Sequence, residues 1–144
     1  MHYFLKCIEE IEPCLPLIKN IDDEQLAIIE TKIGTGVAKG INAACNVCEE
    51  VFTKLFLENN NLTDGDLGVI LDGAKQLYVL RKIVIRRNIF GPLSLHRISE
   101  ILPKFFPQNL EELRIERCKI NREVTLGLIK AMNEGCFLRR LALV

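Results

Sequence analysis

Apolar residues recur along the chain in a five-position pattern at a nearly constant interval. The clearest copy is Leu110–Ile120, LEELRIERCKI, in which the first, fourth, sixth, ninth and eleventh places are apolar or small. Matching stretches begin at Phe52 and Leu80, and another starts at Leu138. The intervals are 28, 30 and 28 residues (80−52, 110−80 and 138−110). Because fixed periods of about 20–50 residues mark repeat architectures, the pattern predicts a series of similar structural units.

Within each copy the pattern predicts one extended segment. The fourth and sixth places alternate with the third and fifth, so their side chains point to the same, buried face of a strand. Asn at the ninth place can bond the backbone where the strand turns away, and Cys118 fits there as a small buried residue with a weak S–H donor. The five places are Phe52, Leu55, Leu57, Asn60 and Leu62, then Leu80, Ile83, Ile85, Asn88 and Phe90, and, in a degenerate earlier copy, Asp23, Leu26, Ile28, Thr31 and Ile33.

Between these extended segments, the apolar residues follow the spacing of a helix. Thr63 and Asp64 are candidate caps, Pro92 suits a first helical turn, and Pro103 should end its helix near Leu102. The two extra residues of the 30-residue interval are expected in Lys104–Asn109. The expected buried stripes are Leu67, Ile70, Leu71 and Ala74; Leu95, Ile98, Ile101 and Leu102; and Leu128, Ile129 and Met132.

One strand and one helix in about 28 residues resembles the ribonuclease-inhibitor-like subclass of leucine-rich-repeat proteins. The resemblance covers about residues 23–144 and rests on the consensus L-x-x-L-x-L-x-x-N/C-x-L. It implies an α/β fold: a right-handed leucine-rich-repeat solenoid, forming a horseshoe segment. Its parallel sheet would line the concave face and its helices the convex face.

The expected organisation is one repeat domain behind a short N-terminal segment. Residues 1–22 are interpreted as a helical cap or as the remnant of a preceding repeat. Repeats are expected at 23–51, 52–79, 80–109 and 110–137, with a partial one at 138–144. The last, apolar strand suggests a fragment of a longer protein, or an edge that a partner covers by edge-to-edge association.

The third, fifth and seventh places of each copy should face the concave side, where such solenoids bind partners. There they form a charged stripe around an exposed aromatic residue, which suits a polar protein partner. Alternatively, Arg86 with Glu116 and Lys82 with Glu112 simply pair across strands; the two interpretations are compatible. The candidate partner-binding residues are Lys54, Phe56, Glu58, Lys82, Val84, Arg86, Glu112, Arg114, Glu116 and Arg140. Reversing Arg86 and Arg114 to Glu is expected to spare the fold and weaken binding.

Composition narrows the class of partner. The 19 basic and 19 acidic residues of the 144 balance, so no global charge favours nucleic acid or an acidic membrane. No apolar run approaches the roughly 18 residues of a membrane-spanning helix, and no secretory signal begins the chain. The six cysteines are therefore expected to be reduced in a cytoplasmic protein.

No arrangement of residues predicts catalysis, a cofactor or a metal. Cys45-x-x-Cys48 has the spacing of half a zinc site, but no second pair of ligands accompanies it. Cys45 stands on the core-facing register of its helix, which favours a buried structural thiol. Neither a phosphate-binding loop nor a nucleophile elbow occurs.

The expected function is therefore a non-catalytic protein–protein interaction module or a scaffold subunit of a larger assembly. The family resemblance adds two alternatives. One is a GTPase-regulating protein of the Ran GTPase-activating type. The other is the sensor segment of a nucleotide-binding leucine-rich receptor.

Overall fold

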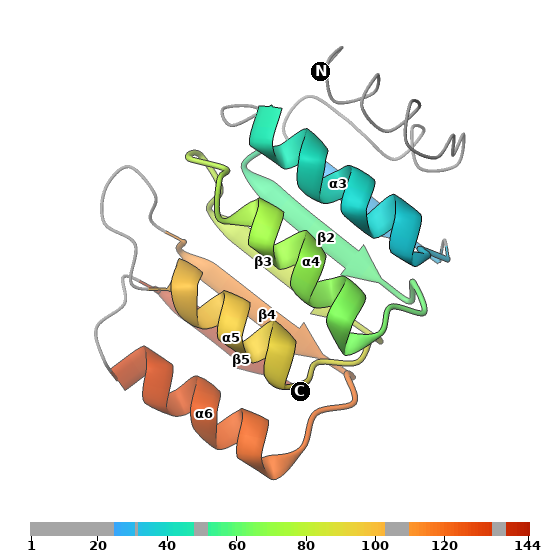
Figure 1. Cartoon of the computed structure of the whole chain (residues 1–144). Coiled ribbons are helices and arrows are strands. Elements are labelled where there is room, and N and C mark those ends of the chain that lie inside the picture. The colour runs from blue at the N-terminus through green and yellow to red at the C-terminus, as the bar shows by residue number, and fades with distance from the viewer. Residues whose placement is uncertain (1–24, 31, 48–51, 103–109, 134–137) are drawn as a thin grey trace.

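The computed structural model describes residues 25–30, 32–47, 52–102, 110–133 and 138–144. Within these ranges strands and helices alternate along the chain (Figure 1). The elements are β1 (Gln25–Ile29), α3 (Thr35–Val47), β2 (Lys54–Glu58), α4 (Asp64–Ala74), β3 (Lys82–Arg86), α5 (Pro92–Ile101), β4 (Glu112–Glu116), α6 (Arg122–Asn133) and β5 (Arg140–Leu143). The predicted α/β class is confirmed. The segment interpreted as a cap, residues 1–22, and Lys104–Asn109 lie outside the described residues.

The strands form one parallel sheet in sequence order, β1-β2-β3-β4-β5. Parallel neighbours require a crossover connection, and here a helix supplies each one. The register pairs Leu55 with Ile83 and Ile83 with Leu113. Equivalent places of successive sequence copies therefore stand side by side, as the spacing predicts.

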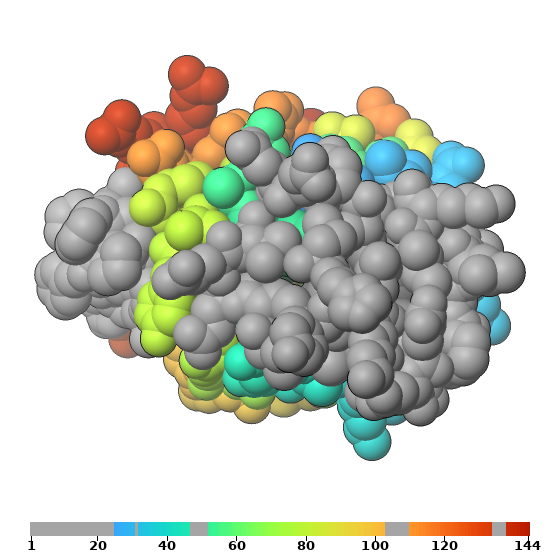
Figure 2. Space-filling view, turned by 90° about the horizontal axis from the view of Figure 1, so that it is seen from above, coloured from blue at the N-terminus to red at the C-terminus, as the bar shows by residue number. Residues whose placement is uncertain are grey.

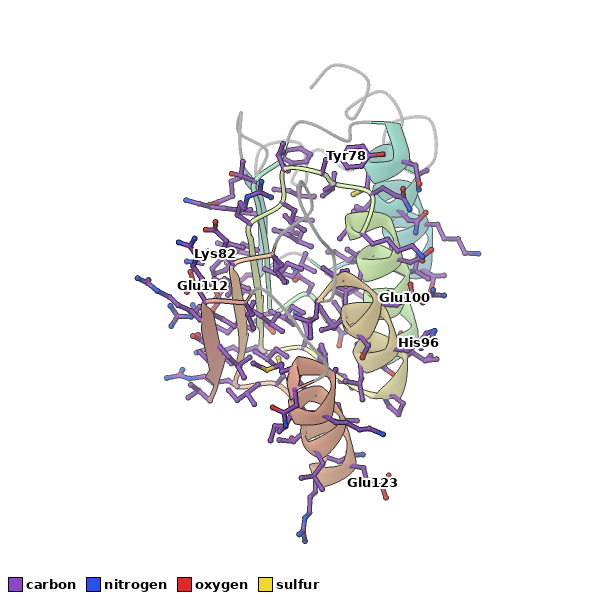
Figure 3. The ribbon with its side chains drawn as sticks, turned by 90° about the vertical axis from the view of Figure 1, so that its left-hand side faces the viewer. Tyr78, Lys82, His96, Glu100, Glu112 and Glu123 are labelled. Carbon is purple, nitrogen blue, oxygen red and sulfur yellow. The ribbon has the colours of Figure 1, made fainter. Side chains whose placement is uncertain are left out.

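All the helices described cover the same face of the sheet. Figure 3 shows the sheet edge-on with the helices on one side of it, and the view from above in Figure 2 shows α3 (teal) and α5 (gold) along one margin and the strand segments along the other. The fourth- and sixth-place side chains fill the space between the layers, and Ile83, Ile85 and Leu113 are fully buried. Burying each such side chain stabilises the fold by about 1.5–3 kcal/mol.

The helix boundaries follow from local chemistry. Thr63 is the N-cap of α4, and its hydroxyl accepts a hydrogen bond from the Asp66 N–H at 3.1 Å. Pro92 opens α5, where its missing N–H costs nothing. This helix ends at Ile101 with Leu102 as its C-cap, as Pro103 predicts.

The predicted buried stripe of α6 is wrong at Ile129, which is 43% exposed. Helix α4 lies between α3 and α5 and buries both Ile70 and its neighbour Leu71, whereas α6 packs closely against α5 alone among the described helices. The buried face of α6 is therefore narrower and leaves Ile129 outside it. Val124 and Leu128 are the buried pair, four residues apart. The other predicted stripes are confirmed, with Leu95 packed against the core from a partly buried position.

The turn after each strand is built in the same way. The ninth-place side chains donate to backbone carbonyls on the strand of the previous copy. Asn60 Nδ2 donates to the Ile28 carbonyl at 3.0 Å, Asn88 Nδ2 to the Leu57 carbonyl at 3.3 Å, and Cys118 Sγ to the Ile85 carbonyl at 3.4 Å. Just before it, the eighth-place residue has a left-handed backbone in all four copies that include this place, with φ of 51–52° at Glu30, Asn59, Arg87 and Arg117. The sequence repeat is thus also a repeat of backbone geometry.

Cys45 is buried in the hydrophobic core, as its place on the helix predicts. Burial raises the pKa of the Cys118 thiol above its ordinary value, which disfavours the reactive thiolate form. Cys48 and Cys136 lie outside the described residues.

Candidate functional site: the open face of the sheet

The face of the sheet opposite the helices is hereafter called the open face. It carries the third, fifth and seventh places of the copies, which the parallel register aligns in rows. The third- and fifth-place rows cross β2, β3, β4 and β5, and the seventh-place row crosses β2, β3 and β4. Lys82 and Glu112 are labelled there in Figure 3, whereas His96 and Glu100 lie on the outer side of the helices. The strands thus bring all ten sequence-predicted residues together: Lys54, Phe56, Glu58, Lys82, Val84, Arg86, Glu112, Arg114, Glu116 and Arg140.

Arg86 is the first centre of an ion network on this face. Its Nη2 lies 2.7 Å from Glu116 Oε2, and its Nε donates to the same oxygen at 2.8 Å. On the other side, Nη1 lies 3.5 Å from Glu58 Oε2. One guanidinium on β3 therefore holds carboxylates from both neighbouring strands.

Arg114 extends the network along β4. Its Nε donates to Glu116 Oε1 at 2.6 Å, and its Nη1 lies 3.8 Å from Glu112 Oε1. Glu112 in turn approaches Lys82 Nζ at 3.4 Å. The order Glu58–Arg86–Glu116–Arg114–Glu112–Lys82 alternates in sign and sums to zero charge; we call these six residues the open-face ion network.

Glu116 is the buried centre of this network, with only 7% of its surface exposed. Burial alone would raise the pKa of its carboxyl. The hydrogen bonds and charges of Arg86 and Arg114 outweigh burial and hold that pKa below its ordinary value. Glu116 is therefore ionised at neutral pH and fixes both guanidinium groups in place.

The middle row contains the apolar part of the open face. Phe56 is half-buried, and the guanidinium carbon of Arg86 lies 5.4 Å from the centre of its ring, within cation–π range. Val84 beside it is only 3% exposed. Phe56 therefore supplies the apolar contact surface, and Val84 mainly supports it.

The two cross-strand pairs considered from sequence, Arg86 with Glu116 and Lys82 with Glu112, are both formed. This changes one sequence-based expectation. Reversing Arg86 and Arg114 to Glu would bring two new carboxylates against buried Glu116, so that change would destabilise the sheet as well as alter its surface. Tests of binding need residues outside the network.

A pocket of about 350 Å³ opens where the strands begin. It is lined by the second- and third-place residues of four successive copies, and we call it the strand-start pocket. Only its third-place residues are predictable from the sequence, because the alternation of side chains holds within a strand and the second place precedes the strand. The lining residues are Thr53, Lys54, Arg81, Lys82, Glu111, Glu112, Arg139 and Arg140.

The described part of the chain shows neither a metal site nor a membrane-spanning helix. No group of three or more His, Cys, Asp or Glu side chains there is arranged to hold a metal ion. In the same ranges, no helix has the length and apolar character needed to cross a bilayer.

No protein-family model matches the sequence, and no curated protein matches it.

Proposed function

We propose that this chain is a segment of a leucine-rich-repeat solenoid of the ribonuclease-inhibitor-like type, and that it serves as a non-catalytic protein-interaction module. In this proposal the open face is the concave, partner-binding side. The helices form the convex side and maintain the spacing of the strands.

The recurring turn geometry supports the family assignment. An amide or thiol at the ninth place donates to the preceding strand in three successive copies, at Asn60, Asn88 and Cys118. Strands that follow one another in sequence also neighbour one another in space. Both features are typical of solenoids, in which each repeat contacts only its neighbours.

The observation that carries the functional proposal is the prearranged chemistry of the open face. Its guanidinium groups are held by fixed carboxylates before any partner arrives, and Phe56 lies among them. Preorganised Arg and aromatic side chains lose little conformational entropy on binding, which suits them as interface anchors. The described residues add no observation that favours the GTPase-regulating or receptor-sensor alternatives.

The test is affinity capture with the purified chain from extract of its native source, followed by titration of each captured protein with purified components. Phe56→Ala is the matched variant, because it removes the apolar anchor and leaves the open-face ion network charged as before. Loss of a hot-spot aromatic costs about 2 kcal/mol or more of binding free energy, which is a roughly thirtyfold weaker Kd.

The control is Leu126→Ala on α6, where a 54% exposed apolar side chain of the helical side is removed. It should leave binding unchanged. A partner that binds the Phe56→Ala variant as tightly as the wild type, but not the Leu126→Ala variant, would move the interface to the helices. Stimulated GTP hydrolysis by a captured GTPase would replace the scaffold proposal with the regulatory one.

A further inference from the structure

The strand-start pocket has an excess of positive charge. Its lining holds five cationic side chains and two carboxylates, which gives a formal charge of +3 (5−2) in a chain whose net charge is zero. The cations are Lys54, Arg81, Lys82, Arg139 and Arg140, and the carboxylates are Glu111 and Glu112. Such local concentration of one sign attracts ligands of the other.

The backbone beneath the pocket is held by a repeated hydrogen-bond arrangement. The Thr53 carbonyl accepts from both the Arg81 and Lys82 N–H groups, at 2.8 and 3.1 Å. The Arg81 carbonyl accepts likewise from the Glu111 and Glu112 N–H groups, at 2.8 and 3.0 Å. The Glu111 carbonyl accepts in the same way from the Arg139 and Arg140 N–H groups. The lining side chains therefore start from fixed points about 4.8 Å apart.

Arg81 is oriented without being neutralised. Its Nη1 donates to the carbonyl oxygens of Tyr78 and Leu80, at 3.3 and 3.2 Å. A carbonyl is a dipole and not an anion, so the guanidinium keeps its full charge while losing freedom of movement. This is the preorganised state that favours binding of a carboxylate.

The remaining cations differ in whether they already form an ion pair with a carboxylate. Lys82 shares Glu112 with Arg114, at 3.4 and 3.8 Å. Lys54 and Arg140, at opposite ends of the third-place row, are exposed and form no ion pair with a carboxylate of the described residues. The pocket thus has unsatisfied positive charge on both sides of its two glutamates.

We infer that the strand-start pocket binds an acidic peptide segment of a protein partner through that segment's carboxylates. The inference rests on the proposed function and specifies the chemistry of the partner. Four strands at about 4.8 Å spacing span about 14 Å, the reach of four to five extended residues. Glu111 and Glu112 would meet backbone N–H groups or a basic residue of such a segment.

A peptide fits this lining better than a nucleic acid. Sites for single-stranded nucleic acid combine cations with aromatic stacking platforms, and none of the eight lining residues is aromatic. A nucleic acid would therefore lack the stacking part of its binding energy here, whereas the carboxylates of a peptide need only the cations.

The test is fluorescence anisotropy of labelled hexaglutamate with the whole chain, at low and at physiological salt, beside labelled hexalysine and oligothymidine. Hexaglutamate should bind most tightly and weaken with salt. The double change Lys54→Glu/Arg140→Glu should weaken it about fivefold or more, because each exposed ion pair contributes a factor of about 1.5–5. Circular dichroism verifies that the variant keeps the secondary-structure content of the wild type.

The matched control is Arg87→Glu/Arg117→Glu. It changes the net charge equally but alters exposed residues at the opposite ends of the strands, beside a separate pocket of about 300 Å³. Hexaglutamate binding should survive this change nearly intact. Equal loss in the two double variants would show attraction to net charge alone and overturn the inference, as would tighter binding of oligothymidine than of hexaglutamate.

The outcome is separable from that of the proposed function. A protein partner that depends on Phe56 but binds the Lys54→Glu/Arg140→Glu variant unchanged, with no hexaglutamate binding, overturns the pocket and leaves the interaction module standing. Hexaglutamate binding that the Lys54→Glu/Arg140→Glu change abolishes, without any protein partner, supports the pocket and overturns the interaction module.

Discussion

At the scale of single residues, Asp64 links two repeats. It lies in the first turn of α4, yet its carboxylate accepts hydrogen bonds from the N-terminus of α5, from the N–H groups of Gly91, Leu93 and Ser94 at 2.9, 2.9 and 3.0 Å. The Ser94 hydroxyl adds a fourth at 2.6 Å. A Cβ at Gly91 would lie 2.6 Å from the Asp64 carboxylate, so glycine is needed there to admit the cap. One side chain thus satisfies donors that α5 cannot satisfy itself.

The protonation of Asp64 should therefore affect stability. Burial alone would raise the pKa of this carboxyl, but the donors from α5 outweigh burial and lower it below its ordinary 3.8. A lowered folded-state pKa contributes stability above the unfolded value, and that contribution is lost as pH falls through the folded-state value. Asp64→Ala should cost about 1–2 kcal/mol at pH 7, and the gap to wild type should shrink below about pH 4.

Urea denaturation at a series of pH values checks this. The control is Asp66→Ala, two residues along the same helix turn, whose carboxylate accepts from the Thr35 hydroxyl at 3.3 Å on the exposed surface. Its cost should stay within about 0.5 kcal/mol, as at most surface sites. Equal losses in both variants would mean that charge near the α4 N-terminus, and not the cap on α5, matters.

At the scale of elements, α3 and α4 approach too closely for any side chain at Gly73. A Cβ there would lie 2.7 Å from the Asn42 backbone Cα, and backbone cannot move aside as a side-chain end can. Asn42 also ties the helices together, since its Nδ2 donates to the Val69 carbonyl at 2.8 Å. The separation of these helices, and hence of the strands they follow, depends on this contact.

Gly73→Ala should consequently destabilise the chain although alanine is the better helix former. The steric cost of overpacking, about 1–3 kcal/mol, exceeds a propensity gain of about 0.5–1 kcal/mol. Gly68→Ala in the same helix is the control: its nearest contact would be an ordinary 3.5 Å from Leu93 Cβ, so that variant should match or exceed wild-type stability. The free energies of unfolding in urea decide it, and a stabilised Gly73→Ala would show that the helices can separate.

How much of this could be read from the sequence differs between elements. The strands and their register were predictable, because the spacing of Leu55, Ile83 and Leu113 directly encodes both period and buried face. The left-handed turns at Glu30, Arg87 and Arg117 were not predictable, since Glu and Arg seldom adopt positive φ. The only sequence signal for these turns is that all three residues stand directly before the ninth place. The strand-start pocket was predicted only in part, because Arg81 and Arg139 precede the alternating strands.

At the scale of the whole molecule, the core is continuous across the repeats. A single cluster of buried side chains extends from Leu26 on β1 to Leu128 on α6, and Leu113 lies within it, fully buried. No single repeat can enclose its own apolar face, so each depends on its neighbours. A destabilising substitution in one strand should therefore lower the free energy of unfolding of all the packed repeats and not of that strand alone.

Leu113→Ala tests this interdependence. Removing a fully buried leucine leaves a cavity and should cost about 2–5 kcal/mol, with the m-value of urea unfolding unchanged if the described repeats unfold as one unit. Leu126→Ala, at a 54% exposed position on α6, is the matched control and should cost well under 1 kcal/mol. A loss below half a kcal/mol for Leu113→Ala would refute the register, because a side chain on the open face would leave no cavity behind. A split into two transitions would instead place a boundary between repeats that fold separately, and the open face would then be two surfaces with independent stability.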